Sequence, residues 1–283
     1  MNVFINGRIL PEEDVLIRAS DRGFTLGDGI FETMRSQAGR IHCLDAHLER
    51  LRRSAERLRI PLPLGFSELP EALTNTLVAN DLDSGDAALR LTLTRGPGPR
   101  GLPPPAKPDP TLIISAAPAP KKNGRQIRVC LVGIPRNEHS PLAQIKSINY
   151  LENILARMEA EAQGGDDALM RNLAGHLAET TVANLFLVID GIAFTPPLED
   201  GPLPGVTRAR ILTLGDRLPC AVAERHLRLD DIAEAEEAFL TNSLVGVQPL
   251  VAVDGNAIGN GRVGPYTRRI KSVYEESVFS EVS

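Results

Sequence analysis

Hydrophobic and polar residues alternate along much of the first 120 residues, with the period of two that half-buried β-strands show. The alternation is clearest in ALRLTLTRG, residues 88–96, where three leucines share one face and Arg90 lies on the other. Shorter strands are predicted at residues 2–9, 15–20, 30–34 and 111–119. Because Asn/Gly turns separate several of these strands, the pattern favours antiparallel pairing.

A helical period replaces the alternation in three stretches. The first, AHLERLRRSAERLRI at residues 46–60, follows Asp45, which we expect to be its N-cap. A second helix is predicted at residues 67–80. In the third stretch, residues 144–161, the apolar residues recur at helical spacing, which predicts one buried stripe. That stripe consists of Ile148, Leu151, Ile154, Leu155 and Met158.

Proline and glycine mark the boundaries of the predicted domains. The segment GPGPRGLPPPAKPDP, residues 96–110, is too rich in both for regular structure, and a loop of this length in a compact protein is either disordered or functional. PAPKKNG, residues 118–124, is the best candidate for a linker. We therefore predict one domain at residues 1–117, an interdomain linker at 118–124 and a second domain at 125–283.

Composition limits the classes of function. The chain has 283 residues, of which 42% are hydrophobic and 24% charged, as in an ordinary globular protein. A net charge of -5 gives no reason to expect nucleic-acid binding, and no apolar run reaches the roughly 18 residues of a membrane span. No signal peptide is visible, and three widely spaced cysteines suit a reducing, cytoplasmic compartment. The cysteines and the five histidines show no metal-ligand spacing, so we expect no metal site.

Lys146 is the candidate catalytic residue, and Glu179 is a candidate functional carboxylate. Lys146 stands where the chain enters the third predicted helix among apolar neighbours. Desolvation at such a position disfavours the charged amine, as a carbonyl-reactive lysine requires, although most lysines at helix starts are solvated surface groups. Glu179 precedes the apolar strand predicted at residues 185–188. Burying a carboxylate beside an apolar core costs free energy unless the group is ion-paired or hydrogen-bonded, and such a carboxylate often serves a function.

Several residues are suited to binding an anion. Arg50 lies beside the apolar stripe of the helix at 46–60, where a guanidinium can grip a phosphate through two parallel hydrogen bonds. A predicted helix start also suits an anion, because its first N–H groups have no intrahelical partner. The small and polar residues in question are Gly205, Val206 and Thr207 at this helix start, and Asn242 and Ser243 at the end of a later strand.

These motifs occur together in one known family. IKSINYLENILA around Lys146, HLAETTVANLF around Glu179, LPGVTR around Thr207 and HLERLRRSAERL around Arg50 stand in that family's chain order. GFTLGDGIFETM and LTNSLVGVQPL match as well. The chain resembles the fold-type IV pyridoxal-phosphate enzymes, which include branched-chain and D-amino-acid aminotransferases and aminodeoxychorismate lyases. The resemblance covers nearly the whole chain.

The resemblance implies a two-domain α/β fold, with a small N-terminal α/β domain, a larger C-terminal α/β pseudo-barrel domain and pyridoxal 5'-phosphate between them. It implies that Lys146 forms a Schiff base with the cofactor and moves a proton, while Glu179 pairs with the pyridine nitrogen. Tyr150 resembles a tyrosine that some members place beside the ring. The implied phosphate ligands are Arg50, Val206, Thr207, Asn242 and Ser243, and Gly205 is implied to be part of the cofactor-binding site. The family is homodimeric, and the neighbouring subunit completes each substrate pocket.

The reaction stays open at this stage. Phe31 stands where typical D-amino-acid aminotransferases have tyrosine, and Arg100 lacks the spaced histidine that follows the loop arginine in those enzymes. Arg90 falls where branched-chain enzymes direct a strand arginine toward the substrate carboxylate, and Arg95 or Arg100 could assist it. Either loop arginine could equally be a solvated charge. The motifs LTRGPGPRGL and LTNSLVGVQPL look more like the lyase branch.

We therefore expect amino-group transfer between an amino acid of D- or branched-chain type, or an amine, and a 2-oxo acid. The alternative is an aminodeoxychorismate lyase, which releases pyruvate and 4-aminobenzoate for folate synthesis. A third hypothesis, a protein that binds the cofactor without turnover, has little support because no expected catalytic group is missing.

Overall fold

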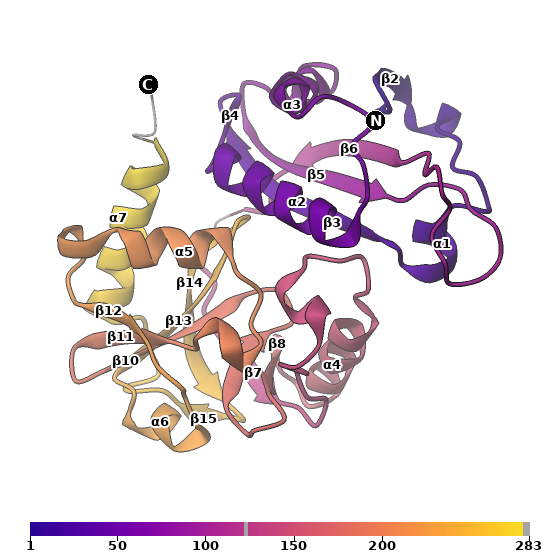
Figure 1. The fold of residues 1–283 in the computed structure, drawn as a ribbon. Coiled ribbons are helices and arrows are strands. Elements are labelled where there is room, and N and C mark those ends of the chain that lie inside the picture. Colours follow the sequence, from indigo (N-terminus) through magenta and orange to yellow (C-terminus); the bar gives the residue numbers. More distant parts are fainter. Residues whose placement is uncertain (122–123, 280–283) are drawn as a thin grey trace. The chain divides into compact units, whose positions relative to one another are not determined.

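The computed structural model describes residues 1–121 and 124–279, and the chain forms two compact units (Figure 1). Unit 1 contains Met1–Pro120 together with Lys146–Asn149, and unit 2 contains the rest of the described chain. The short segment from Lys146 to Asn149 therefore belongs to the N-terminal unit, although the sequence placed it in a domain at 125–283. The proposed linker at 118–124 includes residues 122 and 123, which lie outside the described residues.

Unit 1 is built on an antiparallel sheet with the strand order β2-β1-β6-β5-β3-β4. Its strands are β1 (Asn2–Ile5), β2 (Arg8–Pro11), β3 (Gly29–Gln37), β4 (Arg40–Ile41), β5 (Asp86–Thr94) and β6 (Thr111–Pro118). Asn6 and Gly7 both have positive φ, 42° and 89°, as the tight turn between β1 and β2 requires. The strands predicted at 2–9, 30–34, 88–96 and 111–119 are confirmed.

Two helices cover this sheet. α2 (Leu44–Leu58) packs against β3, and α3 (Leu69–Val78) packs against β6 and β1. Leu48, Leu51 and Ala55 are buried on α2, as the helical period predicts. The predicted cap is wrong, because the helix begins at Leu44 and Asp45 lies inside its first turn. There the carboxylate still faces the positive end of the helix dipole.

The strand predicted at residues 15–20 does not form. The side chain of Leu16 is 86% exposed, and the segment belongs to no strand of the structure. Apolar and β-branched residues favour a strand only where a neighbouring strand pairs with them and a core covers one face. The glycine-containing segment that follows forms the short helix α1 (Arg22–Leu26), which ends at Gly27 with φ 67°.

Unit 2 contains a nine-stranded sheet that closes on itself. Its strands are β7 (Ile127–Leu131), β8 (Asp167–Arg171), β9 (Leu177–Thr180), β10 (Asn184–Ile189), β11 (Ile192–Thr195), β12 (Val222–Glu224), β13 (Glu237–Asn242), β14 (Gly246–Val253) and β15 (Asn256–Ala257). Because β9 pairs with both β8 and β10, the strands β10-β13-β14-β7-β8-β9 form a ring. This barrel-like sheet confirms the predicted pseudo-barrel.

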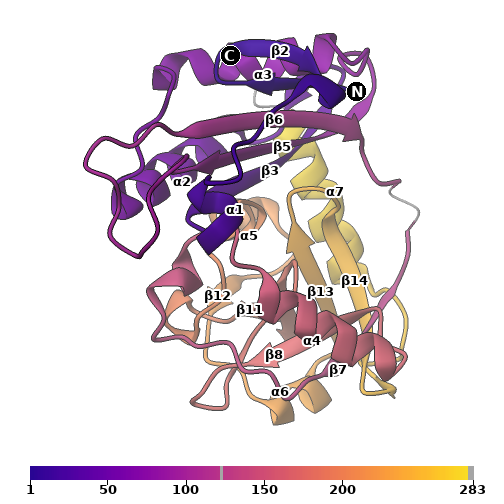
Figure 2. The same ribbon diagram turned by 90° about the vertical axis from the view of Figure 1, so that its right-hand side faces the viewer.

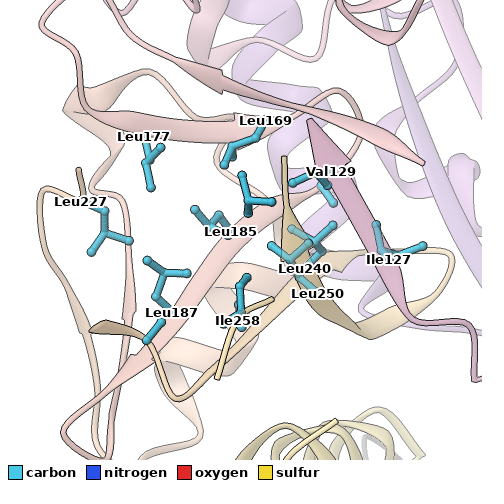
Figure 3. Packing of buried hydrophobic residues seen from close by; sticks show 14 of the residues in the cluster. Ile127, Val129, Leu169, Leu177, Leu185, Leu187, Leu227, Leu240, Leu250 and Ile258 are labelled. Carbon is cyan, nitrogen blue, oxygen red and sulfur yellow. The ribbon is translucent and has the colours of Figure 1, made fainter. Parts of the chain in front are cut away.

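The core of unit 2 consists of aliphatic side chains from strands of the ring (Figure 3). Leu185 and Leu187 of β10, Leu240 of β13 and Leu250 of β14 are all at most 3% exposed. Around the sheet lie α5 (Val206–Thr213), α6 (Leu229–Glu234) and α7 (Pro265–Phe279), of which α7 packs on β14 and β13. Short 3-10 helices occur at Glu12–Asp14, Phe66–Glu68, Pro141–Gln144, Leu198–Asp200 and Gly215–Arg217.

The helix that follows Lys146, α4 (Leu151–Ala162), buries a different face from the one predicted. It packs along β8 and β7 (Figure 2) through small residues, among them Ala156 and Ala160, which are fully buried. The apolar side chains expected inside are exposed, with Leu151 at 68%, and Ile148 precedes the helix. Periodicity shows that these side chains share a face but does not show what covers that face.

Every helix within residues 1–121 and 124–279 is too short or too polar to traverse a lipid bilayer.

Candidate functional site

Lys146 is held against the start of β3. The backbone N–H of Phe31 donates to the carbonyl of Lys146 at 2.9 Å, and the N–H of Ile148 donates to the carbonyl of Gly29 at 3.1 Å. These bonds attach the segment 146–148 to β3 as a short antiparallel bridge. The Lys146 side chain is half-buried, and its Nζ lies 4.3 Å from the centroid of the Phe31 ring. The backbone of Lys146 is thus held by sheet hydrogen bonds.

Arg90 reaches the same aromatic ring from the neighbouring strand. In the β3–β5 ladder Thr33 pairs with Arg90, and Phe31 pairs with Thr92. The guanidinium carbon of Arg90 lies 3.8 Å from the centroid of the Phe31 ring, a distance at which a cation is attracted by the ring face. Phe31 itself is buried. One ring therefore supports both the amine of Lys146 and a guanidinium suited to a carboxylate.

Arg50 is paired with a carboxylate that the sequence did not single out. Its Nε and Nη2 donate to the two oxygens of Glu32 at 2.8 and 2.6 Å, and His47 Nδ1 lies 2.7 Å from the same carboxylate. Glu32 is 1% exposed. Burial alone would raise the pKa of Glu32, but the charge of Arg50 and the bonds from Arg50 and His47 outweigh it and lower the pKa to about 2. A buried arginine on a helix needs such a partner, which is the signal that could have found Glu32.

His47 completes this buried group. Burial lowers the pKa of His47, against the opposing effect of the Glu32 carboxylate. The ring is therefore neutral near pH 7 and donates its Nδ1–H to Glu32. The Glu32 carboxylate, itself bound by His47, holds the guanidinium of Arg50 in one orientation.

The loop arginines differ in their surroundings. Arg95 is buried, and its guanidinium binds both oxygens of Asp28 and the backbone carbonyls of Leu58 and Arg59. These contacts hold β5 to the start of β3 and the end of α2, and a substrate-binding role for Arg95 stays a prediction. Arg100 is exposed in the loop after β5.

That loop is anchored by Arg22, which the sequence did not mark. Its Nη1 donates to the carbonyl of Gly101 at 3.0 Å and its Nη2 to that of Leu102 at 2.8 Å. Its Nε donates to Asp28 at 2.8 Å. Burial would raise the pKa of Asp28, but the bonds from Arg95 and Arg22 outweigh it and lower the pKa. Asp28 thus stays ionised, and through Arg22 it connects the loop to the start of β3.

In unit 2, Glu179 lies on β9 in an environment that compensates its burial. It is 5% exposed, and the Nε of Arg136 lies 3.1 Å from its Oε1. The backbone N–H of Leu203 donates to its Oε2 at 3.0 Å, and the side-chain amide of Asn184 lies 3.5 Å from the same oxygen. Arg136 is itself held by the carbonyls of Gly201 and Ala143. The carboxylate is therefore held in one position.

Sheet register places Glu179 in line with the anion-binding candidates of unit 2. Glu179 on β9 pairs with Asn184 on β10, and Asn184 pairs with Thr241 on β13. The residues after Thr241 are Asn242 and Ser243, where β13 turns into β14. The buried hydroxyl of Thr241 has no hydrogen-bond partner among the residues that the structure describes.

The helix start and the turn offer neutral hydrogen-bond donors. Gly205 is the N-cap of α5, and a Cβ at this position would lie 1.9 Å from Asn184 Oδ1, so the close approach requires glycine. Val206 and Thr207 occupy the first turn, whose N–H groups lack intrahelical partners. In the turn, Asn242 Oδ1 accepts from the N–H groups of Leu244 and Val245, both at 3.0 Å. The Asn242 side chain therefore shapes the turn.

The structure thus groups the predicted residues by unit. Unit 1 contains Lys146, Phe31, Arg90 and Arg50, and unit 2 contains Glu179, the start of α5 and the turn after β13. Tyr150, at the N-cap of α4, belongs to unit 2 and is half-buried.

Comparison with known proteins identifies the family. Residues 29–253 match the family model described as Amino-transferase class IV.

The chain belongs to the class IV aminotransferase family.

Two curated relatives of this class IV aminotransferase span nearly its whole length. It is 34% identical over 280 residues to the "Putative branched-chain-amino-acid aminotransferase" of Methanocaldococcus jannaschii, covering 98% of this chain and 96% of the relative. It is 29% identical over 284 residues to the D-alanine aminotransferase of Bacillus licheniformis, covering 100% and 99%. The chain is thus similar to relatives with two different donor specificities.

Solved structures agree with this family. The branched-chain amino acid aminotransferase of Escherichia coli superposes with a TM-score of 0.92 at 28% identity, covering 100% of this chain and 96% of that one. The "Putative 4-amino-4-deoxychorismate lyase" of Legionella pneumophila superposes with a TM-score of 0.86 at 33% identity, covering 94% and 96%.

Class IV aminotransferases use pyridoxal 5'-phosphate, so this chain is a pyridoxal-phosphate-dependent enzyme. The residues of unit 2 fit that group. A phosphate ester suits the free N–H groups of the α5 start and the Thr207 hydroxyl, and the buried Glu179 carboxylate can accept a ring N–H. The partnerless Thr241 hydroxyl, next to the turn after β13, agrees with a polar ligand in this region.

Proposed function

We propose that this enzyme is an aminotransferase that moves an amino group between an amino acid or amine and a 2-oxo acid. The observation that carries the proposal is the pair of basic side chains on the Phe31 ring, with Lys146 Nζ at 4.3 Å and the Arg90 guanidinium at 3.8 Å. An amine is the nucleophile for carbonyl chemistry, and a guanidinium binds a carboxylate through two parallel hydrogen bonds. A site that transfers the amino group of an amino acid needs both groups, the amine for the carbonyl chemistry and the guanidinium for the substrate carboxylate.

The other residues take supporting roles in this proposal. Pyridoxal 5'-phosphate, when bound, supplies an electron sink for the charge that develops at the substrate carbon. Lys146 would hold the cofactor through its Nζ and would move a proton at that carbon. Glu179 would accept the hydrogen bond of the pyridine nitrogen, and Tyr150 would contact the ring. Arg50, Val206, Thr207, Asn242 and Ser243 would bind the phosphate, with Gly205 at the same helix start.

The covalent role of Lys146 is tested by the colour of the purified protein. We expect the wild-type holoenzyme to be yellow and Lys146→Ala to lose this visible absorption. Lys107→Ala, which removes an exposed lysine from the proline-rich loop, should stay yellow. A Lys146→Ala protein with an unchanged visible spectrum would remove Lys146 from the cofactor.

The donor is tested with half-reactions. The holoenzyme is mixed separately with D-alanine, D-glutamate, L-leucine and (R)-1-phenylethylamine, and conversion of the cofactor to its amino form is followed by absorbance. The similarity to branched-chain and D-alanine aminotransferases supports including donors of both configurations. Conversion by any of them supports transamination.

A lyase is the second candidate, because a structure similar to this chain, with 33% identity, is described as a lyase of 4-amino-4-deoxychorismate. The loop motif LTRGPGPRGL and the turn motif LTNSLVGVQPL also favour it. If none of the four donors converts the cofactor to its amino form, and the enzyme releases pyruvate from aminodeoxychorismate, the lyase proposal replaces the aminotransferase proposal.

The role of Arg90 is tested by comparing donors with and without a carboxylate. Arg90→Ala should lower kcat/KM for an amino acid by about 10-fold or more, because a charged hydrogen-bond partner is lost. With (R)-1-phenylethylamine, which has no carboxylate, the same variant should react as fast as the wild type. Arg100→Ala serves as the matched comparison on the loop. An unchanged KM for amino acids would exclude Arg90 from the carboxylate site.

We also propose that the enzyme is a homodimer, as its family resemblance implies. The exposed side chains of Leu151, Ile154, Leu155 and Met158 on α4 support this, since a contiguous apolar face on a helix is typical of a covered surface. A cytoplasmic location stays a prediction from the sequence.

A further inference from the structure

A group of metal-ligating side chains lies in unit 2 and includes none of the residues assigned above. His176 precedes β9, Asp200 ends the 3-10 helix Leu198–Asp200, and His226 follows β12. One ligand atom from each of the three lies within 4.8 Å of the others. The residues are far apart in the sequence, so their spacing predicts no metal site, and only the fold brings them together.

The two imidazoles face the same carboxylate. His176 Nδ1 lies 2.9 Å from Asp200 Oδ1, and His226 Nδ1 lies 2.9 Å from Asp200 Oδ2. Both separations are hydrogen-bond distances, in which a ring Nδ1–H can donate to a carboxylate oxygen. Tetrahedral ligands that are each about 2.1 Å from one zinc ion lie about 3.4 Å apart, so an ion that replaces the two ring protons can contact the carboxylate and both rings once the side chains move to admit it.

Asp200 is a buried carboxyl group whose partners are neutral or weakly basic side chains. It is 3% exposed, and among the residues that the structure describes no arginine or lysine forms an ion pair with it. Its neighbours are the two imidazoles and the side-chain amide of Asn172, which donates to Oδ1 at 3.1 Å. A buried carboxylate with only neutral or weakly basic partners is costly, and a divalent cation would supply the missing charge.

The outer nitrogen of His226 fits a metal site, whereas that of His176 contacts an arginine. Ring nitrogens opposite a metal commonly donate to a carboxylate, and His226 Nε2 lies 3.5 Å from Glu199 Oε1. His176 Nε2 lies 3.3 Å from Arg228 Nη2. Arg228 is exposed and can rotate away when that nitrogen carries a proton.

We propose that His176, Asp200 and His226 bind a divalent transition-metal ion of the zinc class. Two imidazole nitrogens and one carboxylate are ligands that zinc accepts, whereas calcium and magnesium prefer oxygen ligands only. The remaining coordination positions fall to the second carboxylate oxygen and to water. The ion ties together the segment before β9, the end of the 3-10 helix and the segment after β12, so its effect is on the stability of unit 2. The site does not rest on the proposed aminotransferase activity.

The test uses the full-chain holoenzyme without a histidine tag, freed of metals by a chelator and dialysed. Zinc chloride is titrated by calorimetry, and the melting temperature is measured by circular dichroism. We expect one zinc ion per chain and a rise in melting temperature of roughly 5 °C at a zinc concentration of about 100 times the dissociation constant. Magnesium chloride should produce neither effect.

The decisive variants are His226→Ala and His139→Ala. Both remove an exposed histidine from unit 2, but only His226 belongs to the group. His226→Ala should weaken zinc binding by at least about 10-fold and abolish the thermal shift, while His139→Ala should behave as the wild type. His226→Gln, which retains polarity, replaces the first variant if that one fails to fold. Absence of saturable zinc binding, equal binding by both variants, or equal binding of magnesium would each overturn the proposal.

Discussion

At the scale of single residues, the buried carboxylates determine how the functional side chains are held. Glu179 and Glu32 are each nearly fully buried, and each is bound by one arginine and further donors. Removing the arginine from such a pair leaves a buried charge without compensation, which is more costly than losing an exposed ion pair. Arg136 and Arg50 are therefore sensitive positions.

Arg136 is expected to act through Glu179 as a positioning residue. Arg136→Ala should weaken binding of pyridoxal 5'-phosphate by about 10-fold or more, because the Glu179 carboxylate loses the charged hydrogen bond from Arg136. The measurement is a titration of the apoenzyme with cofactor, followed by visible absorbance. Arg136→Lys should restore part of the affinity, and Arg269→Ala, an exposed arginine on α7, should have none of these effects. Equal affinity of Arg136→Ala and wild type would show that Glu179 does not depend on Arg136.

The lowered pKa of Glu32 predicts how the stability of the protein depends on pH. Its pKa is lowered to about 2 in the folded state, below its ordinary value of 4.5, so its ionised form stabilises the protein above pH 4.5. This stabilisation declines as the pH falls from about 4.5 toward 2. Glu32→Gln should cost about 3–5 kcal/mol at pH 7, since the buried ion pair with Arg50 is broken, and the difference from wild type should narrow by about 1–2 kcal/mol by pH 3.

The measurement for Glu32 is the free energy of unfolding in urea at pH 7, 5 and 3. Glu56→Gln, on the exposed side of α2, is the matched control, and its difference from wild type should show no comparable narrowing. A Glu32→Gln difference that is the same at every pH would contradict the lowered pKa.

At the scale of elements, close packing at the start of α5 positions the candidate phosphate ligands. Asn184 contacts Gly205 on one side and binds Leu203 and Glu179 on the other. The helix start and the carboxylate are thus joined through one amide. An added methyl group at Gly205 is expected to disturb both.

Gly205→Ala should destabilise the enzyme by about 1–3 kcal/mol, because its Cβ would overlap Asn184 Oδ1. Cofactor affinity should fall at the same time, since the helix start moves. The control is Gly133→Ala, whose Cβ would have its nearest neighbour at 3.7 Å, an ordinary contact distance. Thermal unfolding and a cofactor titration measure the two effects. Unchanged cofactor affinity in a folded Gly205→Ala protein would argue against a phosphate at this helix.

At the scale of the whole molecule, the exposed face of α4 connects the fold to the proposed assembly. Small residues on the inner face let the helix approach β8 and β7 closely, and its larger apolar side chains remain outside. Four exposed apolar side chains on one helix favour association of the monomer in water. A second copy of this chain would cover them.

Ile154→Glu should therefore shift the enzyme from dimer to monomer, because it places a charge in the apolar stripe. Sedimentation velocity at micromolar concentration measures the shift. Gln163→Glu adds the same charge at the end of α4, outside the stripe, and should leave the dimer intact. A wild type that sediments as a monomer, or an Ile154→Glu protein that stays dimeric, would contradict this interface.

The sequence by itself determined the local structure and the family. Alternation predicted the strands around Leu89 and Leu112, and the 3.6-residue period predicted α2 and α3, because these patterns depend on local geometry. The order of the motifs around Arg50, Lys146, Glu179 and Thr207 predicted a fold-type IV enzyme, which the family match confirms. The roles of those residues stay predictions that the experiments above test.

The tertiary structure decided what each side chain contacts. The sequence shows an apolar stripe on α4 but not that the opposite, small-residue face is the one buried. Neither the pairing of Arg95 with Asp28 nor that of Arg136 with Glu179 could be derived from spacing, because the partners are 67 and 43 residues apart. The same holds for His176, Asp200 and His226. Periodicity acts along one element, whereas ion pairs and ligand groups depend on which elements the fold places side by side.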